Sequence, residues 1–231
     1  MLKVVNTGIG AADYNMRFDE KLLEELDSKG EPILHLYDWE GLSATYGYFI
    51  RPEKHLDLAK AEKWGVSLAR RSTGGGIVFH IWDLAFSFLM PAEHKFFSLN
   101  TLENYQFVNR AVLEVMKEFL GLREEVELIA QEGEGNVRHF CMAKPTVYDV
   151  VYQGRKIAGA AQRRRKQGYL HQGTISLVSP QIDLLEELLL EKEEVVEAMK
   201  AYTFVGVQRE ELAGARREIQ KRLAENLAGI L

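Results

Sequence analysis

The sequence predicts an α+β protein with a mostly antiparallel or mixed sheet flanked by helices. Short β-like runs occur in groups separated by Gly, Pro or charged residues, and they do not alternate regularly with helices. A strongly amphipathic helix separates two of these groups in the middle of the chain. The part from about residue 181 to 231 is predicted to be helical. No repeat or linker divides the chain, so we expect residues 1–231 to form a single domain.

Each element has its own pattern. A helix is expected over about 13–29, because apolar residues recur there at helical spacing and the Gly-Glu-Pro sequence at 30–32 ends it. Strands are expected at 33–37, 43–49, 66–69, 77–80 and 85–90. The amphipathic helix carries apolar residues from Phe107 to Phe119. Two strands, at 147–152 and 155–158, flank Gln153-Gly154, a two-residue hairpin signal, and a further strand ends near Leu177.

Composition excludes several classes of protein. The 231 residues include 29 Lys+Arg and 34 Asp+Glu, a formal net charge of −5, and 46% are hydrophobic, which excludes disorder. Apolar runs fall far short of the roughly 20 residues of a membrane span, and the N-terminus lacks a signal-peptide pattern. A single cysteine allows no internal disulfide, and no Cys/His spacing fits zinc. We expect a cytoplasmic protein that binds neither membranes nor bulk nucleic acid.

The most unusual segment is RRSTGGGIVFH at 70–80. Three consecutive glycines let backbone N–H groups converge on an anion, and Arg71 supplies planar donors suited to phosphate or carboxylate. The alternative is a flexible hairpin loop with solvated arginines. With Arg71 before the glycines and His80 after them, we favour an anion site.

Two later segments also carry candidate residues. Lys156 follows the predicted hairpin turn, and the small residues at 158–161 leave room for a ligand, although an ordinary exposed lysine would have the same position. The Arg-Arg-Arg-Lys run at 163–166 is either a solvated face or a patch for an acidic protein partner. His171 and Gly173 lie on a strand where a glycine permits close approach, yet a lone histidine there is more often structural.

Cys141 is the only cysteine. A lone cysteine is usually a small buried hydrophobe. With Lys144 and Lys156 nearby in the sequence, it is also a candidate nucleophile of lowered pKa.

Taken together, four segments resemble the lipoate–protein ligase A family of the biotin/lipoate/octanoyl transferase superfamily. They are YNMRFDE at 14–20, RRSTGGGIVFH at 70–80, GRKIAGAAQ at 154–162 and LHQGTISL at 170–177. The resemblance covers about residues 5–180. It implies a class II biotin ligase/lipoate ligase-like catalytic domain, in a short form without the C-terminal accessory domain.

The resemblance also implies an activity. Ligases of this family activate lipoate with ATP and Mg²⁺ to lipoyl-AMP. They then transfer the lipoyl group to a lysine of a lipoyl domain of a 2-oxoacid dehydrogenase E2 or of the glycine-cleavage H protein. By motif position Lys156 would contact both the phosphate and the lipoate carboxyl oxygen, and Asp149 would serve the metal or the incoming lysine. The residues expected to bind substrate or ATP are Arg71, Gly75, Gly76, Ile77, Val78, Phe79, His80, Gly159, His171 and Gly173.

Some residues depart from the ligase pattern. Ile81 and Asp83 stand where family ligases commonly have Asp and Asn. Cys141 begins a C-x-x-x-P sequence that is similar to single-domain octanoyltransferases, which move an octanoyl group from acyl carrier protein through a cysteine thioester and use no ATP. Because the glycines are followed by Ile-Val-Phe-His in the ligase manner, and Asp149 is the ligase-like residue, the sequence favours the ligase, with the octanoyltransferase as the alternative.

Overall fold

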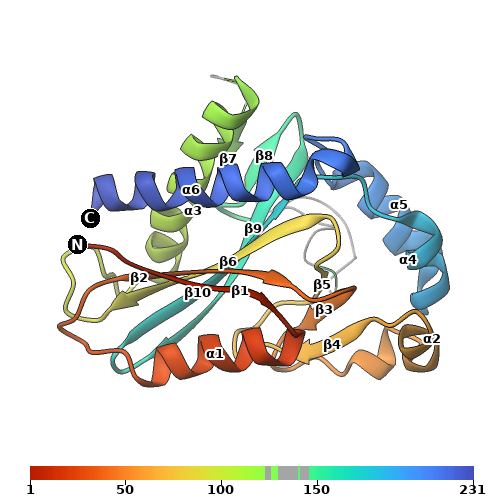
Figure 1. Cartoon of the computed structure of the whole chain (residues 1–231), viewed down its shortest axis with the longest axis horizontal. Helices are drawn as coiled ribbons and strands as arrows, with labels where there is room; N and C mark the ends of the chain where they lie inside the picture. Colours follow the sequence, from red (N-terminus) through yellow and green to blue (C-terminus); the bar gives the residue numbers. More distant parts are fainter. Residues whose placement is uncertain (123–125, 130–139, 141–145) are drawn as a thin grey trace.

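A computed structural model describes the whole chain except residues 123–125, 130–139 and 141–145. Within the described residues, seven strands form one sheet in the order β1-β2-β6-β10-β9-β8-β7, and three form a second sheet in the order β4-β3-β5 (Figure 1). Strand β1 pairs with β2 in parallel, as β3 does with β4, and the other pairs are antiparallel. The predicted mixed sheet is therefore confirmed.

The elements alternate only loosely between strand and helix. The strands are β1 (Lys3–Gly10), β2 (Ile33–Trp39), β3 (Ser43–Tyr46), β4 (Ser67–Arg70), β5 (Ile77–Phe79), β6 (Asp83–Pro91), β7 (Val126–Leu128), β8 (Val150–Tyr152), β9 (Arg155–Arg165) and β10 (Gly168–Ser176). The helices are α1 (Ala12–Glu24), α2 (Leu58–Lys63), α3 (Thr101–Leu120), α4 (Ile182–Leu188), α5 (Lys192–Tyr202) and α6 (Leu212–Ile230), with 3₁₀ turns at Pro52–Lys54 and Arg209–Glu211.

Strand β6 lies inside the large sheet and is buried at every position. Successive side chains of a strand point to opposite faces. Phe88 packs toward Phe107 of α3, whereas its neighbour Ser87 bonds Asp19 of α1, so both faces of the sheet are covered. The larger core lies on the α3 and α6 side, and each fully buried Phe there contributes roughly 1.5–3 kcal/mol. The α1 side holds smaller apolar clusters and leaves room for a cavity.

The main differences from the predicted elements have local causes. Strand β3 ends at Tyr46, because Gly47 turns away and approaches the glycine loop so closely that a Cβ there would lie 2.0 Å from the Gly75 carbonyl oxygen. The hairpin at Gln153 and Gly154 is confirmed, with φ of +49° and +75°. Strand β9 continues past the predicted end at 158, since β10 pairs with it along most of its length.

The C-terminal part of the chain forms the helices α4, α5 and α6. Helix α6 packs along α3, away from α1, and α4 packs against α5 (Figure 1). Main-chain bonds from the segment after α5 reach the large sheet, since the Phe204 N–H donates to the Lys156 carbonyl at 3.1 Å. No helix in the described ranges has the length and apolarity needed to cross a membrane.

A substitution at Gly173 of β10 can test the packing on the α3 face of the large sheet. A Cβ at Gly173 would lie 2.5 Å from two ring carbons of Phe86, so Gly173→Ala must displace a buried ring. We expect a loss of about 1–3 kcal/mol in the free energy of unfolding, measured with chemical denaturant. Gly214→Ala in α6 is the matched control, because nothing lies within 4 Å and alanine favours the helix. Equal effects of the two substitutions would contradict the packing described.

Candidate active site

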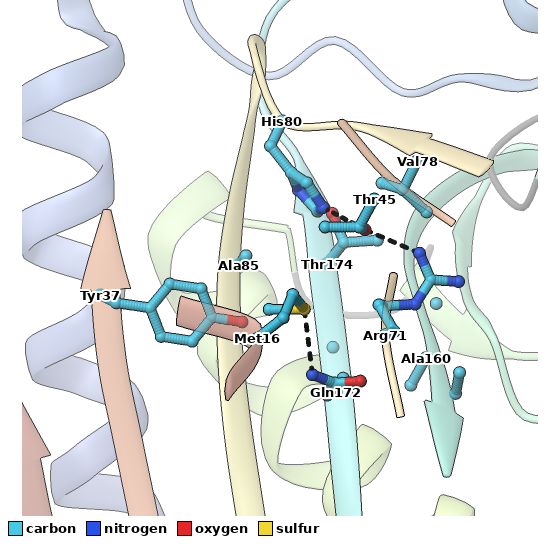
Figure 2. Close-up of a pocket in the computed structure, with 13 residues that line it drawn as sticks. Met16, Tyr37, Thr45, Arg71, Val78, His80, Ala85, Ala160, Gln172 and Thr174 are labelled. Atoms are coloured by element: carbon cyan, nitrogen blue, oxygen red, sulfur yellow. Dashed lines mark hydrogen bonds between the residues drawn. The ribbon is translucent and has the colours of Figure 1, made fainter. Parts of the chain in front are cut away.

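A cavity opens between α1, the large sheet and the small sheet, with an empty volume of about 380 Å³ that includes its mouth (Figure 2). The residues that line it come from seven segments of the chain. They are Met16, Tyr37, Thr45, Arg71, Val78, His80, Ala85, Gly159, Ala160, Ala161, Gln172, Gly173 and Thr174. Most of the exposed lining is apolar, and Ala85 and the glycine and alanines of β9 keep the space open. An apolar lining of this kind suits an apolar group of a ligand.

Arg71 holds the glycine loop, residues 74–76, in its curved form. Its guanidinium donates to the carbonyls of Gly74 at 3.1 Å and Gly76 at 2.8 Å, and to Thr45 Oγ1 at 2.7 Å (Figure 2 shows the last). The side chain is buried. The expected anion-binding arginine therefore lies at the cavity wall with its donors on main-chain oxygens, and it stabilises the loop from inside.

His80 continues the same wall. Its Nδ1 lies 2.7 Å from Asp83 Oδ2, and its Nε2 lies 2.8 Å from Thr45 Oγ1. Thr45 Oγ1 also accepts from Arg71, so one hydroxyl joins the arginine and the histidine. Thr174 donates a short hydrogen bond to the same carboxylate oxygen, and the Trp39 ring stacks on His80 at 4.1 Å. Asp83, the residue that departs from the ligase pattern, thus helps to fix the position of the His80 ring.

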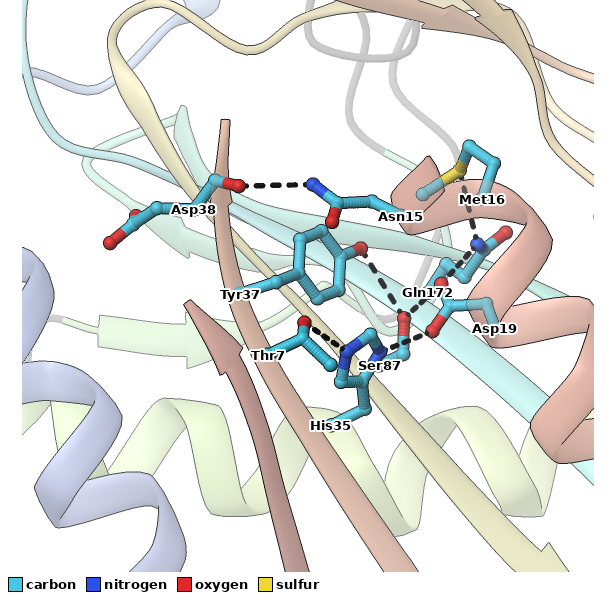
Figure 3. A network of polar contacts seen from close by, with 9 residues as sticks. All are labelled: Thr7, Asn15, Met16, Asp19, His35, Tyr37, Asp38, Ser87 and Gln172. Atoms are coloured by element: carbon cyan, nitrogen blue, oxygen red, sulfur yellow. Dashed lines mark hydrogen bonds and ion pairs between the residues drawn. The ribbon is translucent and has the colours of Figure 1, made fainter. Parts of the chain in front are cut away.

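A second buried network lies beneath the cavity (Figure 3). Asp19 of α1 accepts from Ser87 and from Gln172 Nε2, both at 2.6 Å, and its other oxygen lies 2.7 Å from His35 Nδ1. Gln172 accepts in turn from Thr73 Oγ1 at 2.7 Å. This chain joins α1, three strands and the start of the glycine loop, so the cavity wall and the loop are fixed to one frame. Buried polar groups that are satisfied in this way add rigidity.

Tyr37 stands between this network and the cavity (Figures 2 and 3). Burial, followed by the negative charge of Asp19, raises the pKa of Tyr37 well above its usual value. The hydroxyl therefore stays protonated and donates to Ser87 Oγ, 3.3 Å away. Its ring presents an apolar surface to the cavity.

Lys156 and Asp149 form a buried ion pair at the edge of the cavity. Lys156 Nζ lies 2.6 Å from Asp149 Oδ2, with only 3% and 4% of the two side chains exposed. The same oxygen accepts from the N–H and the hydroxyl of Thr146 at 2.6 and 2.9 Å. Gly159 lines the cavity, and a Cβ there would lie 2.5 Å from Nζ. Because Gly159 lacks that atom, the ammonium lies directly behind the cavity wall.

Other predicted residues lie elsewhere. His171 lies on the opposite face of the sheet, near Tyr105 of α3, where burial lowers its pKa to about 3. Gly173 contributes only backbone to the cavity lining and leaves space for Phe86. Ile77 and Phe79 are buried in the core, whereas Val78 lines the cavity. Cys141 lies outside the described residues.

Several lining residues were not singled out from the sequence. Tyr37 and Thr45 come from segments that show only strand patterns, and Met16 lies within the YNMRFDE segment without being named there as a lining residue. Gln172 lies within a motif but between two residues that drew attention. The available signal was Asp19, a carboxylate at helical spacing from the apolar residues Leu22, Leu23 and Leu26.

The comparisons with known proteins agree with this geometry. The family model of the lipoyl protein ligase A/B catalytic domain matches residues 11–214, so the chain belongs to this family. Octanoyltransferase LipM of Staphylococcus epidermidis is 34% identical over 212 residues, covering 87% of this chain and 74% of the relative. Octanoyltransferase LipM of Carboxydothermus hydrogenoformans is 32% identical over 189 residues, covering 80% and 69%. The family resemblance in the sequence is confirmed.

Solved structures show the same fold. A candidate lipoate protein ligase from T. acidophilum with bound lipoic acid matches with a TM-score of 0.73 and 26% identity, covering 99% of this chain and 86% of the other. Lipoate-protein ligase A bound with ATP matches with a TM-score of 0.69 and 27% identity, covering 98% and 85%. The expected lipoate ligase-like catalytic fold is confirmed. The protein is thus an enzyme of the lipoate/octanoate ligase and transferase family.

The buried ion pair allows a stability test. Lys156→Met removes the ammonium and leaves Asp149 charged in a dry site, so we expect a loss of about 3–5 kcal/mol in the free energy of unfolding. Adding Asp149→Asn should restore most of it, because no unpaired charge remains. Acyl transfer should stay reduced by at least about 100-fold in both variants if the ammonium also acts on substrate. Recovery of activity in the double variant would limit Lys156 to a structural role.

His171 gives a pH dependence of stability. Its pKa is about 3 in the folded protein, against about 6.5 when unfolded. Between these values the unfolded chain binds more protons, so stability falls as the pH drops, by roughly 1 kcal/mol per pH unit from this group. His171→Gln should make the dependence shallower by that amount, measured by denaturation at pH 7 and pH 5. Identical profiles in the two proteins would show that His171 is not held neutral.

Proposed function

We propose that the protein is an octanoyltransferase that moves an octanoyl group from acyl carrier protein to a lysine of a lipoyl domain or of the glycine-cleavage H protein. The proposal rests on one observation. The similar proteins that match most of this chain are named octanoyltransferases. They favour the alternative drawn from the sequence over ATP-dependent lipoate ligation. A lipoyl domain as acceptor is supported by a structural neighbour, a bi-partite lipoate protein ligase studied with its E2 lipoyl domain.

The charges at the cavity support transfer over adenylation. Bringing a triphosphate beside a carboxylate requires cations that can turn toward the new negative charge. Arg71 already donates to two main-chain carbonyls and Thr45, and Lys156 is paired with Asp149. Asp83 adds a buried carboxylate to the wall. These described residues therefore fit ATP poorly.

Mg²⁺ is a poor fit for the same pair. The Asp149 oxygen that would bind a metal already accepts from the ammonium and from two donors of Thr146. A divalent ion there would have to displace the ammonium, against strong repulsion. We infer that Asp149 orients Lys156.

Cys141 is the proposed nucleophile. Its thiolate attacks the carbonyl carbon of the octanoyl thioester, a new carbon–sulfur bond forms, and the carrier leaves as its thiolate, which takes up a proton. In the second step the neutral amine of the acceptor lysine attacks the acyl-enzyme. The amide bond forms, the Cys141 thiolate leaves, and the amine loses a proton. The residue before it in the sequence, Phe140, forms a β-bridge with Ile77 beside the glycine loop.

Lys156 is proposed to stabilise charge in both steps. Each attack converts the thioester carbonyl into a tetrahedral centre with a negative oxygen. The Lys156 ammonium is fixed by Asp149 behind Gly159, at the edge of the space in which the acyl chain would lie. A fixed cation in a site with little water stabilises that oxygen more than a mobile one would. The apolar lining formed by Val78, Ala85 and the β9 alanines would hold the acyl chain.

Replacing Cys141 distinguishes octanoyl transfer from ATP-dependent ligation. Cys141→Ala should abolish octanoyl transfer from carrier protein, because no thioester can form on the enzyme. The parent protein, incubated with octanoyl carrier protein and no ATP, should gain the mass of one octanoyl group on a peptide that contains Cys141. Acceptor modification is followed by mass spectrometry in parallel. If Cys141→Ala keeps its activity and the reaction requires ATP, the protein is a ligase.

A further inference from the structure

An aromatic loop protrudes next to the glycine loop. Phe49 is 88% exposed and Tyr48 is 42% exposed, and their rings meet edge to face at 5.2 Å. The loop is nevertheless held in place, because the Tyr48 N–H donates to the Thr73 carbonyl at 2.8 Å and the Gly47 N–H to the Gly76 carbonyl at 3.2 Å. A firmly held, exposed phenylalanine is a feature of surfaces that bind another protein.

Two arginines lie over the same tyrosine ring. The guanidinium carbons of Arg70 and Arg163 are 4.8 and 5.2 Å from the centre of the Tyr48 ring. Arg163 also donates to the Ser72 carbonyl at 2.8 Å, so it is fixed beside the glycine loop. The ring holds both cations by cation–π attraction although they repel each other. Arg165 of β9 and Lys166 in the turn after it are also exposed, whereas Arg164 donates to the Leu99 carbonyl at 2.7 Å, near the start of α3.

This concentration of cations contrasts with the rest of the chain. The protein carries a formal net charge of −5, so an acidic partner would be repelled by much of its surface and attracted here. The patch is adjacent to the glycine loop, whose flanks at Arg71 and Val78 line the cavity. A partner bound there would have its reacting group close to the acyl site.

We propose that Tyr48, Phe49, Arg70 and Arg163 form a docking surface for the acceptor, an acidic protein domain that presents its lysine to the cavity. The inference rests on the proposed octanoyl transfer and deepens it by naming where the acceptor binds. Phe49 supplies the apolar anchor, and the two arginines supply orientation through carboxylates of the acceptor. This surface would therefore select an acceptor domain that is acidic and exposes a lysine.

The test distinguishes binding of the acceptor domain from loading of the enzyme with the octanoyl group. Phe49→Ser and Arg70→Glu change exposed side chains, so the fold should be retained, and thermal unfolding checks it. We expect the KM for an acidic lipoyl domain to rise at least about 10-fold in each variant. Loading of the enzyme from octanoyl-pantetheine, a small thioester, should stay within two-fold. Lys221→Glu on α6 is the matched charge-reversal control and should leave both values unchanged.

Direct binding makes the result independent of the proposed reaction. Calorimetry of the unloaded protein with the lipoyl domain should show weaker affinity for Phe49→Ser and Arg70→Glu, and weaker affinity of the parent at high salt. An unchanged affinity and KM would overturn the docking surface. So would a loss of loading from octanoyl carrier protein alone, because the surface would then serve the donor. If the parent never acquires an octanoyl group but the affinities change as expected, the proposed reaction fails and the docking surface stands.

Discussion

The structure of the site depends on one buried guanidinium. A loop with three consecutive glycines has no side chains of its own to pack, so its conformation must be imposed from outside. Arg71 imposes it by bonding the Gly74 and Gly76 carbonyls at once, while Gly47 packs against the loop from the other side. One terminal nitrogen of the guanidinium bonds both carbonyls while the other bonds Thr45, so the planar group ties the loop to β3. Val78 and His80 then face the cavity because the loop before them is fixed.

The second determinant is the separation of polar and apolar surfaces around the cavity. The networks through Asp19 and through His80 satisfy most of the polar groups in the walls, so the cavity can present apolar surface without leaving those groups unpaired. Gln172 connects the α1 network to Thr73 at the start of the loop. The cavity is therefore preorganised by hydrogen bonds among its own lining residues and the residues behind them. In the proposed transfer, such preorganisation would let the Lys156–Asp149 pair at the edge act on one atom of a flexible chain.

The sequence predicted those features that depend on residues close together in the chain. The mixed sheet, the Gln153-Gly154 turn and the glycine loop all follow from short patterns. It could not predict that Arg71 turns inward, because its partner Thr45 comes from a distant strand. Nor could it place His171, since the face of a strand on which a residue lies follows from sheet pairing and not from its own motif. Strand β1 was missed because glycines interrupt its alternation. The preference for a ligase gave weight to the residues after the glycine triplet, which form wall and core in this fold.

The main-chain bond between Lys156 and Phe204 has a consequence for how the enzyme is made. Thr203 forms a β-bridge with Lys156, and the Phe204 N–H bonds its carbonyl, so residues that follow α5 complete the strand that carries the lysine. During translation Lys156 is added before Thr203 and Phe204. A nascent chain that already contains the glycine loop therefore still lacks the partners that complete the strand around Lys156. The order of synthesis therefore delays the completed Lys156 segment until the residues that follow α5 have been made.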